Sequence, residues 1–196
     1  DLAMMRAVPN CTVLYPCDAM STERLVMAAA AHKGMVYIRT TRPATPVIYG
    51  ADEKFEIGGS KVIRDAPLAV ATIVAAGITV FEALKASDEL LEAGTPIRVI
   101  DAYSIEPVDV ATLVDSARQT GNALITVEDH YVNGGLGDAV SAAVSALGIQ
   151  VHRLAVKDIP RSGQPDELFD RYGISTTHIV ATVRRLIDSS TSQLTT

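Results

Sequence analysis

The sequence has no run of basic residues and no long apolar segment. It carries 17 Lys and Arg against 23 Asp and Glu, which gives a net charge of -6. Nucleic acids and anionic membrane surfaces are bound through clustered cations, so this balance argues against either as the main partner. No apolar run approaches the length of a membrane span, and the N-terminal residues lack the charged and apolar parts of a signal peptide.

Cysteine is also scarce, since Cys11 and Cys17 are the only two and flank one short predicted strand. Two thiols without further partners favour a reduced, cytoplasmic setting over a disulfide framework. Their spacing, with no histidine cluster nearby, disfavours a zinc site. No serine lies in a GxSxG motif, and no spaced pair of acids suggests a glycosidase. We therefore expect neither a catalytic residue nor a metal ligand in this chain.

The sequence begins without a methionine, and its first 42 residues hold too few elements for a domain. They predict a strand at 12–15, a helix to about residue 32 with Asp18 or Ser21 as its N-cap, and a strand at 35–40. Two parallel strands with one crossover cannot cover both faces of a sheet. We therefore expect residues 1–50 to be the truncated C-terminal end of an α/β domain, and the chain to be a fragment.

A second domain is predicted to follow an interdomain linker at residues 51–58, which Ile48, Tyr49 and Phe55 partly tie down. This domain would span residues 59–196. Its first strands, 61–65 and 68–77, are joined by so short a link that they should be antiparallel. The later predicted strands lie at 97–102, from 123 to about 130 and at 150–156. The predicted helices lie at 79–92, 108–119, 136–147 and 165–172, and a final helix contains Ile179 to Ile187. Their alternation predicts a three-layer α/β/α fold around a five-stranded mixed sheet, with four parallel strands and one antiparallel edge.

The stretch from Ala123 to Leu147 predicts a buried strand, a glycine-rich turn and a helix. The helix has the clearest periodicity in the sequence, because its apolar residues fall on one face: Leu136, Ala139, Val140, Ala143, Val144 and Leu147. Open parallel sheets bind ligands beyond the carboxyl ends of their strands, so a functional site is expected near this turn.

Gly134, Gly135 and Gly137 lie at the mouth of that helix. They could cradle a phosphate or another anion at the helix N-terminus. Alternatively, the turn needs glycine only for positive φ and for close packing of strand and helix. The sequence GGLG is not the GxGxxG motif of dinucleotide-binding proteins, and both interpretations remain open.

Glu128, Asp129 and His130 end the strand before this turn. Adjacent residues of an extended strand point to opposite faces, so the three cannot converge on one ion without a bend. His130 is interpreted as a solvated or interface histidine, with a metal ligand or proton shuttle as the alternative. We leave the role of this triplet open.

Arg42 is the favoured binding residue, because it lies just past the carboxyl end of the 35–40 strand and precedes Pro43. A guanidinium at that edge can make bidentate contacts with a phosphate, and the hydroxyls of Thr40 and Thr41 can add donors. The alternative is a surface arginine that holds the linker. Arg39 is expected to serve packing or an ion pair.

Two further candidates lie near the last strand. Arg161 and Ser162 form a second basic turn between Pro160 and Gly163, for which a solvated arginine in a tight turn is the favoured interpretation. His152 alternates within the strand and is expected to be an edge or core histidine.

Six separated segments, taken in order, resemble the C-terminal third of transketolase, most closely its animal-type branch. They are DLAMMRAVP, TVLYPCDAMSTE, YIRTTRP, IRVIDAYSIEPVD, ITVEDHYVNGGLGDAVSAAV and VKDIPRSGQPDELFDRYGI. The resemblance extends from the first residue to about Ile187. Deoxyxylulose-phosphate synthase and the β subunit of pyruvate dehydrogenase share the fold, but VEDHY and PRSG are more similar to transketolase.

This resemblance implies an enzyme of the pentose phosphate pathway that moves a two-carbon ketol unit between sugar phosphates with thiamine diphosphate and Mg²⁺. Residues 1–50 would end the pyrimidine-binding domain, and residues 59–196 would be the C-terminal domain. The arginine that binds the substrate phosphate in this family matches Arg42, in TTRP. The family's GDG motif, its pyrimidine-activating glutamate and its upstream histidines have no counterpart, and Asp138 in LGDA cannot replace the GDG motif.

The resemblance therefore places thiamine diphosphate and Mg²⁺ in the parent enzyme and none on this piece alone. The piece would supply structure, homodimer contacts and Arg42, and would be inactive without the missing N-terminal domains. Cys17 stands where the resemblance predicts serine, which concerns packing more than mechanism. The alternatives are a regulatory module that binds an anion or nucleotide at the Gly134–Gly137 turn, an assembly domain, or the C-terminal part of either related thiamine-diphosphate enzyme.

Overall fold

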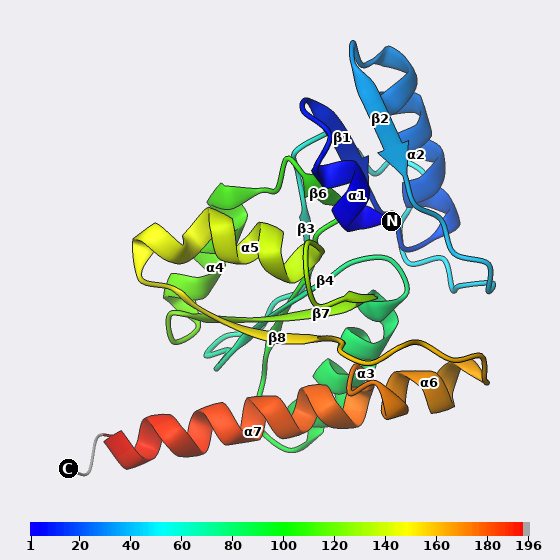
Figure 1. Cartoon of the computed structure of the whole chain (residues 1–196). Helices are drawn as coiled ribbons and strands as arrows, with labels where there is room; N and C mark the ends of the chain where they lie inside the picture. Colours follow the sequence, from blue (N-terminus) through cyan, green and yellow to red (C-terminus); the bar gives the residue numbers. More distant parts are fainter. Residues whose placement is uncertain (194–196) are drawn as a thin grey trace.

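The computed structural model describes residues 1–193, which form two sheets that share a buried interface (Figure 1). In the first sheet, β1 (Cys11–Leu14) and β2 (Met35–Ile38) run parallel, α1 (Leu2–Arg6) precedes them and α2 (Ala19–Ala31) is the crossover. Asp18 Oδ1 accepts a hydrogen bond from Ser21 N at 2.7 Å, and Ser21 Oγ accepts one from Asp18 N at 3.1 Å. The predicted strand–helix–strand order and the predicted cap are confirmed.

The third strand of this sheet comes from much later in the chain. β6 (Ser104–Glu106) pairs antiparallel with β1, which gives the order β2-β1-β6. Only two strands were predicted for this sheet, and no helix or strand was predicted between residues 102 and 108. Three residues before a proline carry no periodic signal, so this strand depends on a tertiary partner that the local sequence does not reveal.

The second sheet has the predicted five strands, in the order β3-β5-β4-β7-β8. They are β3 (Lys61–Arg64), β4 (Thr72–Ala75), β5 (Arg98–Asp101), β7 (Ala123–Tyr131) and β8 (Gln150–Val156). Four are parallel and β3 is the antiparallel edge, as predicted. β3 does not pair with β4, however, because β4 starts at Thr72 rather than Leu68. The longer link lets β5 lie between them.

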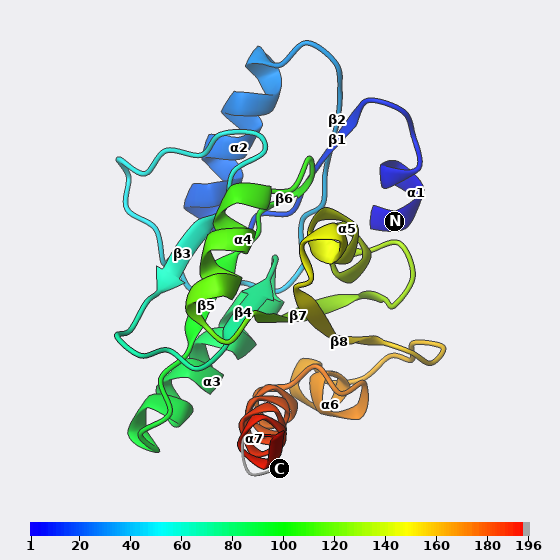
Figure 2. The same ribbon diagram turned by 90° about the vertical axis from the view of Figure 1, so that its left-hand side faces the viewer.

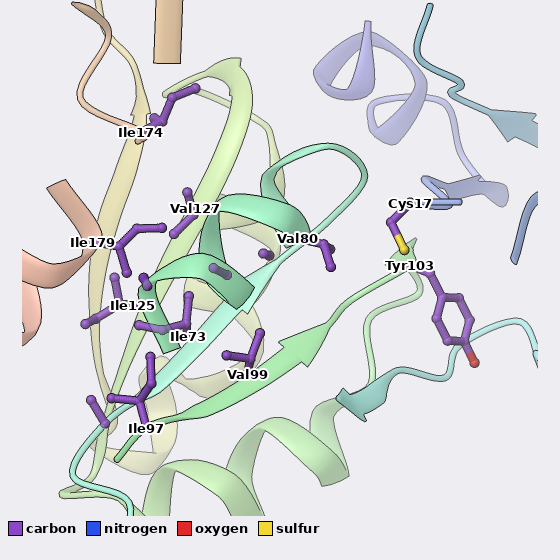
Figure 3. Close-up of a cluster of buried hydrophobic side chains, with 14 of the residues drawn as sticks. Cys17, Ile73, Val80, Ile97, Val99, Tyr103, Ile125, Val127, Ile174 and Ile179 are labelled. Atoms are coloured by element: carbon purple, nitrogen blue, oxygen red, sulfur yellow. The ribbon is translucent and has the colours of Figure 1, made fainter. Parts of the chain in front are cut away.

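Helices cover both faces of the five-stranded sheet (Figures 1 and 2). α3 (Thr79–Glu92), α6 (Pro165–Arg171) and α7 (Thr176–Gln193) pack on one face, and α4 (Val110–Gln119) and α5 (Leu136–Val144) pack on the other. Side chains alternate between them, since Ile73 and Ile125 face α3 and α7 whereas Val74 and Leu124 face α4 and α5. Figure 3 shows the first cluster, with Ile73, Ile125 and Val127 from the strands.

One local expectation needs correction, and another is confirmed for two of its three residues. The helix predicted to reach Leu147 is α-helical only to Val144, and a short 3-10 turn, η1 (Ser145–Leu147), follows it. Leu147 is therefore half exposed rather than on the buried stripe. The linker is packed: Tyr49 and Phe55 are buried, with ring centroids 4.9 Å apart, whereas Ile48 stays exposed. Within residues 1–193, the helices are too short or too polar to span a membrane.

Candidate functional site

A cleft of about 590 Å³ opens beyond the carboxyl ends of β1 and β2. One wall is formed by residues after β2, namely Thr40, Thr41, Pro43, Ala44 and Thr45, and the other is formed by Pro16, Cys17 and the first residues of α2. This is the edge at which open parallel sheets hold ligands. The segment is extended because β2 ends at Ile38 and Pro43 stops it from resuming.

Arg42 lies in the chain between two lining residues, Thr41 and Pro43; it does not itself line the cleft, and it is exposed. In the described part of the chain, its guanidinium has no hydrogen-bond or ion-pair partner. Arg39 differs, because its Nη1 lies 2.7 Å from Asp129 Oδ1 and its guanidinium lies 4.6 Å from the centroid of the Tyr15 ring. The expected packing and ion-pair role of Arg39 is confirmed, and Arg42 is the arginine left available at the cleft.

Asp18, on the opposite wall, is buried and fully engaged. Besides capping α2, its Oδ2 accepts hydrogen bonds from the backbone N–H groups of Ile48 and Tyr49, at 2.8 and 3.1 Å. One carboxylate therefore fixes both the start of α2 and the linker behind the cleft. Sequence analysis identified the cap but missed the linker contact, which needs residues 30 positions apart.

A buried polar cluster lies behind the cleft, where the two sheets and the linker meet. Tyr49 donates its hydroxyl hydrogen to Asp101 Oδ2 at 2.7 Å, and Cys17 Sγ donates to the same oxygen at 3.3 Å. Asp101 is completely buried, and its Oδ1 has no hydrogen-bond partner among residues 1–193. Burial raises the pKa of Asp101 to about 7, against the two hydrogen bonds that favour its ionised form. An aspartate inside the apolar strand IRVIDA was the sequence signal that could have identified this cluster.

From β4 the chain continues to β5 on one side, and it later returns to form β7 on the other side of β4. The crevice beyond the carboxyl ends of β4 and β7 is therefore the usual ligand position in such a sheet. That crevice contains Tyr15. A Cβ on Gly77, just after β4, would lie 1.9 Å from Tyr15 Cζ. The Tyr15 hydroxyl donates to the carboxylate of Asp129 on β7 at 3.1 Å. The first sheet therefore fills the crevice of the second.

The glycine turn is occupied by Glu128. Its Oε2 accepts from Leu136 N at 2.6 Å and its Oε1 accepts from Gly137 N at 2.9 Å, so the anion at the N-terminus of α5 is a side chain of this protein. A Cβ on Gly135 would lie 1.9 Å from Glu128 Oε2, so a larger residue there would displace the carboxylate. Burial raises the pKa of Glu128 to about 7, although both backbone donors favour its ionised form. Binding of an external anion at Gly134, Gly135 and Gly137 stays a prediction.

His130 is buried against α1 rather than solvated. Its Nδ1 lies 2.8 Å from Tyr131 O and its Nε2 lies 3.5 Å from Ala3 N. Burial lowers its pKa. Glu128 and Asp129 make the separate contacts given above. Residues 1–193 bring together no group of three or more His, Cys, Asp or Glu side chains that could hold a metal ion.

The two candidates near β8, Arg161 and His152, contact other parts of the protein or lie within the sheet. Arg161 is exposed, and its backbone N–H donates to the Tyr172 hydroxyl at 2.7 Å. His152 lies on the edge strand β8, as expected, and its buried Nε2 has no hydrogen-bond partner in the part of the chain that the structure describes. No hydrogen bond connects Arg42 to these residues or to the glycine turn within the described chain.

Two family models match the chain, on either side of the linker. Residues 1–47 match the pyrimidine-binding domain of transketolase, and residues 60–179 match the transketolase C-terminal domain. The chain belongs to the transketolase family. The C-terminal model alone covers more than half of the chain, so the resemblance drawn from the sequence motifs is confirmed.

Individual relatives agree with the family models. The chain is 55% identical over 188 residues to transketolase-like protein 1 of Bos taurus, and 46% identical over 188 residues to transketolase of Homo sapiens. These alignments cover 95% of the chain but only 32% and 30% of the two relatives, so the chain spans about a third of their length.

A solved structure described as "Split gene transketolase, inactive beta4 tetramer" has the same fold, with a TM-score of 0.86 and 39% identity. The match covers 94% of this chain and 59% of that one. The mixed five-stranded sheet with helices on both faces is therefore the fold of the transketolase C-terminal domain.

Proposed function

We propose that this chain is the C-terminal segment of a thiamine-diphosphate-dependent transketolase and that Arg42 binds the phosphate of its sugar-phosphate substrates. Residues 1–50 complete a pyrimidine-binding domain and residues 59–196 form the C-terminal domain. The observation that carries the proposal is that Arg42 is exposed and stands in the chain between Thr41 and Pro43, which line a cleft at the carboxyl ends of β1 and β2.

The chemistry of that cleft suits a phosphate. The guanidinium can make two parallel hydrogen bonds to phosphoryl oxygens, and the hydroxyls of Thr40, Thr41 and Thr45 line the same wall. Arg39 is held by Asp129 and Tyr15, so it does not compete for the ligand. Asp18 keeps the opposite wall in place.

The first sheet supports a partner that completes it. Within the described residues, β2 pairs with a strand on one side only, and Val26 and Met27 on α2 are exposed by 49% and 63%. An unpaired strand edge beside exposed apolar side chains is a surface that further strands and helices can cover. A complementary N-terminal part, in the same chain or a separate one, fits this surface, and its assembly with a second copy would supply dimer contacts.

The residues of this chain do not fit the cofactor by themselves. The backbone donors at the glycine turn hold Glu128, and no cluster of metal-ligating side chains forms in residues 1–193. The proposal therefore assigns thiamine diphosphate and Mg²⁺ to the complementary part. This chain binds and orients the phosphorylated end of the substrate.

Reconstitution tests the proposal. The chain is mixed with the N-terminal part of a related transketolase, thiamine diphosphate and Mg²⁺, and ketol transfer between sugar phosphates is measured. We expect activity from the mixture and none from either part alone. Arg118→Gln, an exposed arginine on α4, serves as a charge-matched control for Arg42→Gln. A complex that forms and stays inactive, or that is equally active with Arg42→Gln, contradicts the proposal.

A further inference from the structure

A second cleft, of about 370 Å³, lies at the other end of the chain. It is enclosed by the carboxyl end of β8, the end of α6 and one face of α7. Its lining contains no residue from the first 150, so it is independent of Arg42 and its surroundings. Figure 1 shows β8, α6 and α7 next to one another at this end of the five-stranded sheet.

Two small residues, Ala181 and Gly173, shape the β8–α7 cleft. Ala181 belongs to a stripe of α7 that lines the cleft and also contains His178, Thr182 and Arg185. The short side chain of Ala181 leaves space in the middle of that stripe. Gly173, with φ +71°, ends α6 opposite and contributes no side chain.

The charge of the β8–α7 cleft is opposite to that of the whole chain. Lys157, Arg171 and Arg185 line it against one carboxylate, Asp158, whereas the chain carries a net charge of -6. In the part of the chain that the structure describes, none of the three cations is in an ion pair. Arg185 Nη2 lies 3.2 Å from Thr182 Oγ1, and Arg171 lies 6.0 Å from the centroid of the Tyr172 ring.

The loop beside the β8–α7 cleft is held in place. Tyr172, which lines the cleft, accepts a hydrogen bond from Arg161 N at 2.7 Å and donates to Ile159 O at 3.4 Å. His178 Nδ1 lies 2.9 Å from Ser175 Oγ and 3.5 Å from Asp170 Oδ1. These contacts anchor the walls, so the cations can meet a ligand without reorganising the loop.

We propose that the β8–α7 cleft binds a small phosphate monoester. A phosphate monoester has three terminal oxygens and close to two negative charges at neutral pH, which suits a lining of three cations and one carboxylate in which, among residues 1–193, none of the three cations is in an ion pair. Arg171 and Arg185 offer planar donors, and Lys157 adds a third cation at the end of β8. Leu154 and Ala155 supply an apolar surface for the carbon part of the ligand.

Amide NMR of the 196-residue chain tests this site. Inorganic phosphate and glycerol 3-phosphate are titrated, with glycerol as the uncharged comparison. We expect saturable shifts at Lys157, Gly173 and His178 with both anions and none with glycerol. Arg171→Gln and Arg185→Gln should each weaken binding about tenfold, since each removes one charge-assisted contact.

Two control variants make the result decisive. Arg118→Gln removes an exposed charge from the other face of the sheet, and Arg42→Gln removes the arginine of the proposed transketolase site; both should leave these shifts unchanged. Arg171 and Arg185 are exposed, so their variants should keep the wild-type unfolding temperature. Absence of saturable shifts at millimolar phosphate, or equal weakening by Arg118→Gln, overturns the proposal. Failure of the Arg42 proposal would leave this binding intact.

Discussion

The ring of Tyr15 lies against Gly77 so closely that a Cβ on the glycine would stand 1.9 Å from Tyr15 Cζ. Tyr15 is buried, its hydroxyl donates to Asp129, and Arg39 stacks on its ring while pairing with Asp129. An open α/β sheet usually holds a ligand in this crevice, but here Tyr15, which follows β1 of the three-stranded sheet, occupies it. This contact fixes the cleft beside Arg42 relative to the C-terminal domain.

We expect Gly77→Ala to lower the free energy of unfolding by about 3 kcal/mol, because the methyl group overlaps the Tyr15 ring and φ is +57°. Gly94→Ala is the matched control, since Gly94 has φ +73° and no atom within 4 Å of the added Cβ. It should cost only the backbone strain, about 1 kcal/mol. Denaturant unfolding measures both losses. Equal losses would mean that Tyr15 does not occupy the crevice in solution.

Glu128 should make stability depend on pH. Its folded pKa, about 7, lies above the ordinary value of 4.5, so the folded protein holds this proton more tightly than the unfolded chain. The stability it contributes is fully present below the ordinary pKa and is lost as the pH rises through about 7. Relative to Glu128→Gln, the wild-type free energy of unfolding should fall by up to about 3 kcal/mol across this range.

Chemical unfolding of wild type and Glu128→Gln from about pH 4.5 to pH 8 measures that difference. The pKa of Asp101 is raised in the same direction, but Asp101 is present in both proteins and its contribution cancels. Parallel pH profiles for the two proteins would show that the Glu128 carboxyl is not buried at the N-terminus of α5.

Tyr49 should stabilise the interface through Asp101. We expect Tyr49→Phe to cost about 1.5 kcal/mol, because it removes a buried hydrogen bond to a carboxyl group. The cost should grow above pH 7, since the hydroxyl favours the ionised form of Asp101. Tyr37→Phe removes an exposed hydrogen bond to Asp1 and should cost less than about 0.5 kcal/mol. A smaller loss for Tyr49→Phe than for Tyr37→Phe, measured by thermal unfolding, would contradict the buried role of Asp101.

The fold was largely predictable from the sequence because its signals are local. The apolar stripe from Leu136 to Val144, the Asp18 cap and the alternation of strands and helices each follow from residues close together in the chain. The strand at Ser104–Glu106 was missed because its partner, β1, lies about 90 residues earlier. The direct neighbour of β3 was missed because β4 starts at Thr72 rather than Leu68, and the longer link lets β5 lie between them.

The site was less predictable, because its contacts join distant residues. The sequence pointed to Arg42 and to the glycine turn, but not to Glu128 as the anion of that turn or to Tyr15 as the occupant of the second crevice. A glutamate eight residues before its backbone donor gives no recognisable spacing. Asp101 was the most recognisable of these residues in the sequence, because it is an acidic residue within an apolar strand.

The most direct test of the Arg42 hypothesis compares wild type and Arg42→Gln, each reconstituted with a complementary N-terminal part, on a phosphorylated sugar and on its unphosphorylated form. If Arg42 binds the phosphate, the KM for the sugar phosphate should rise at least about tenfold, while kcat/KM for the unphosphorylated sugar changes less than about twofold. Equal changes for both sugars, or no change for either, would contradict it.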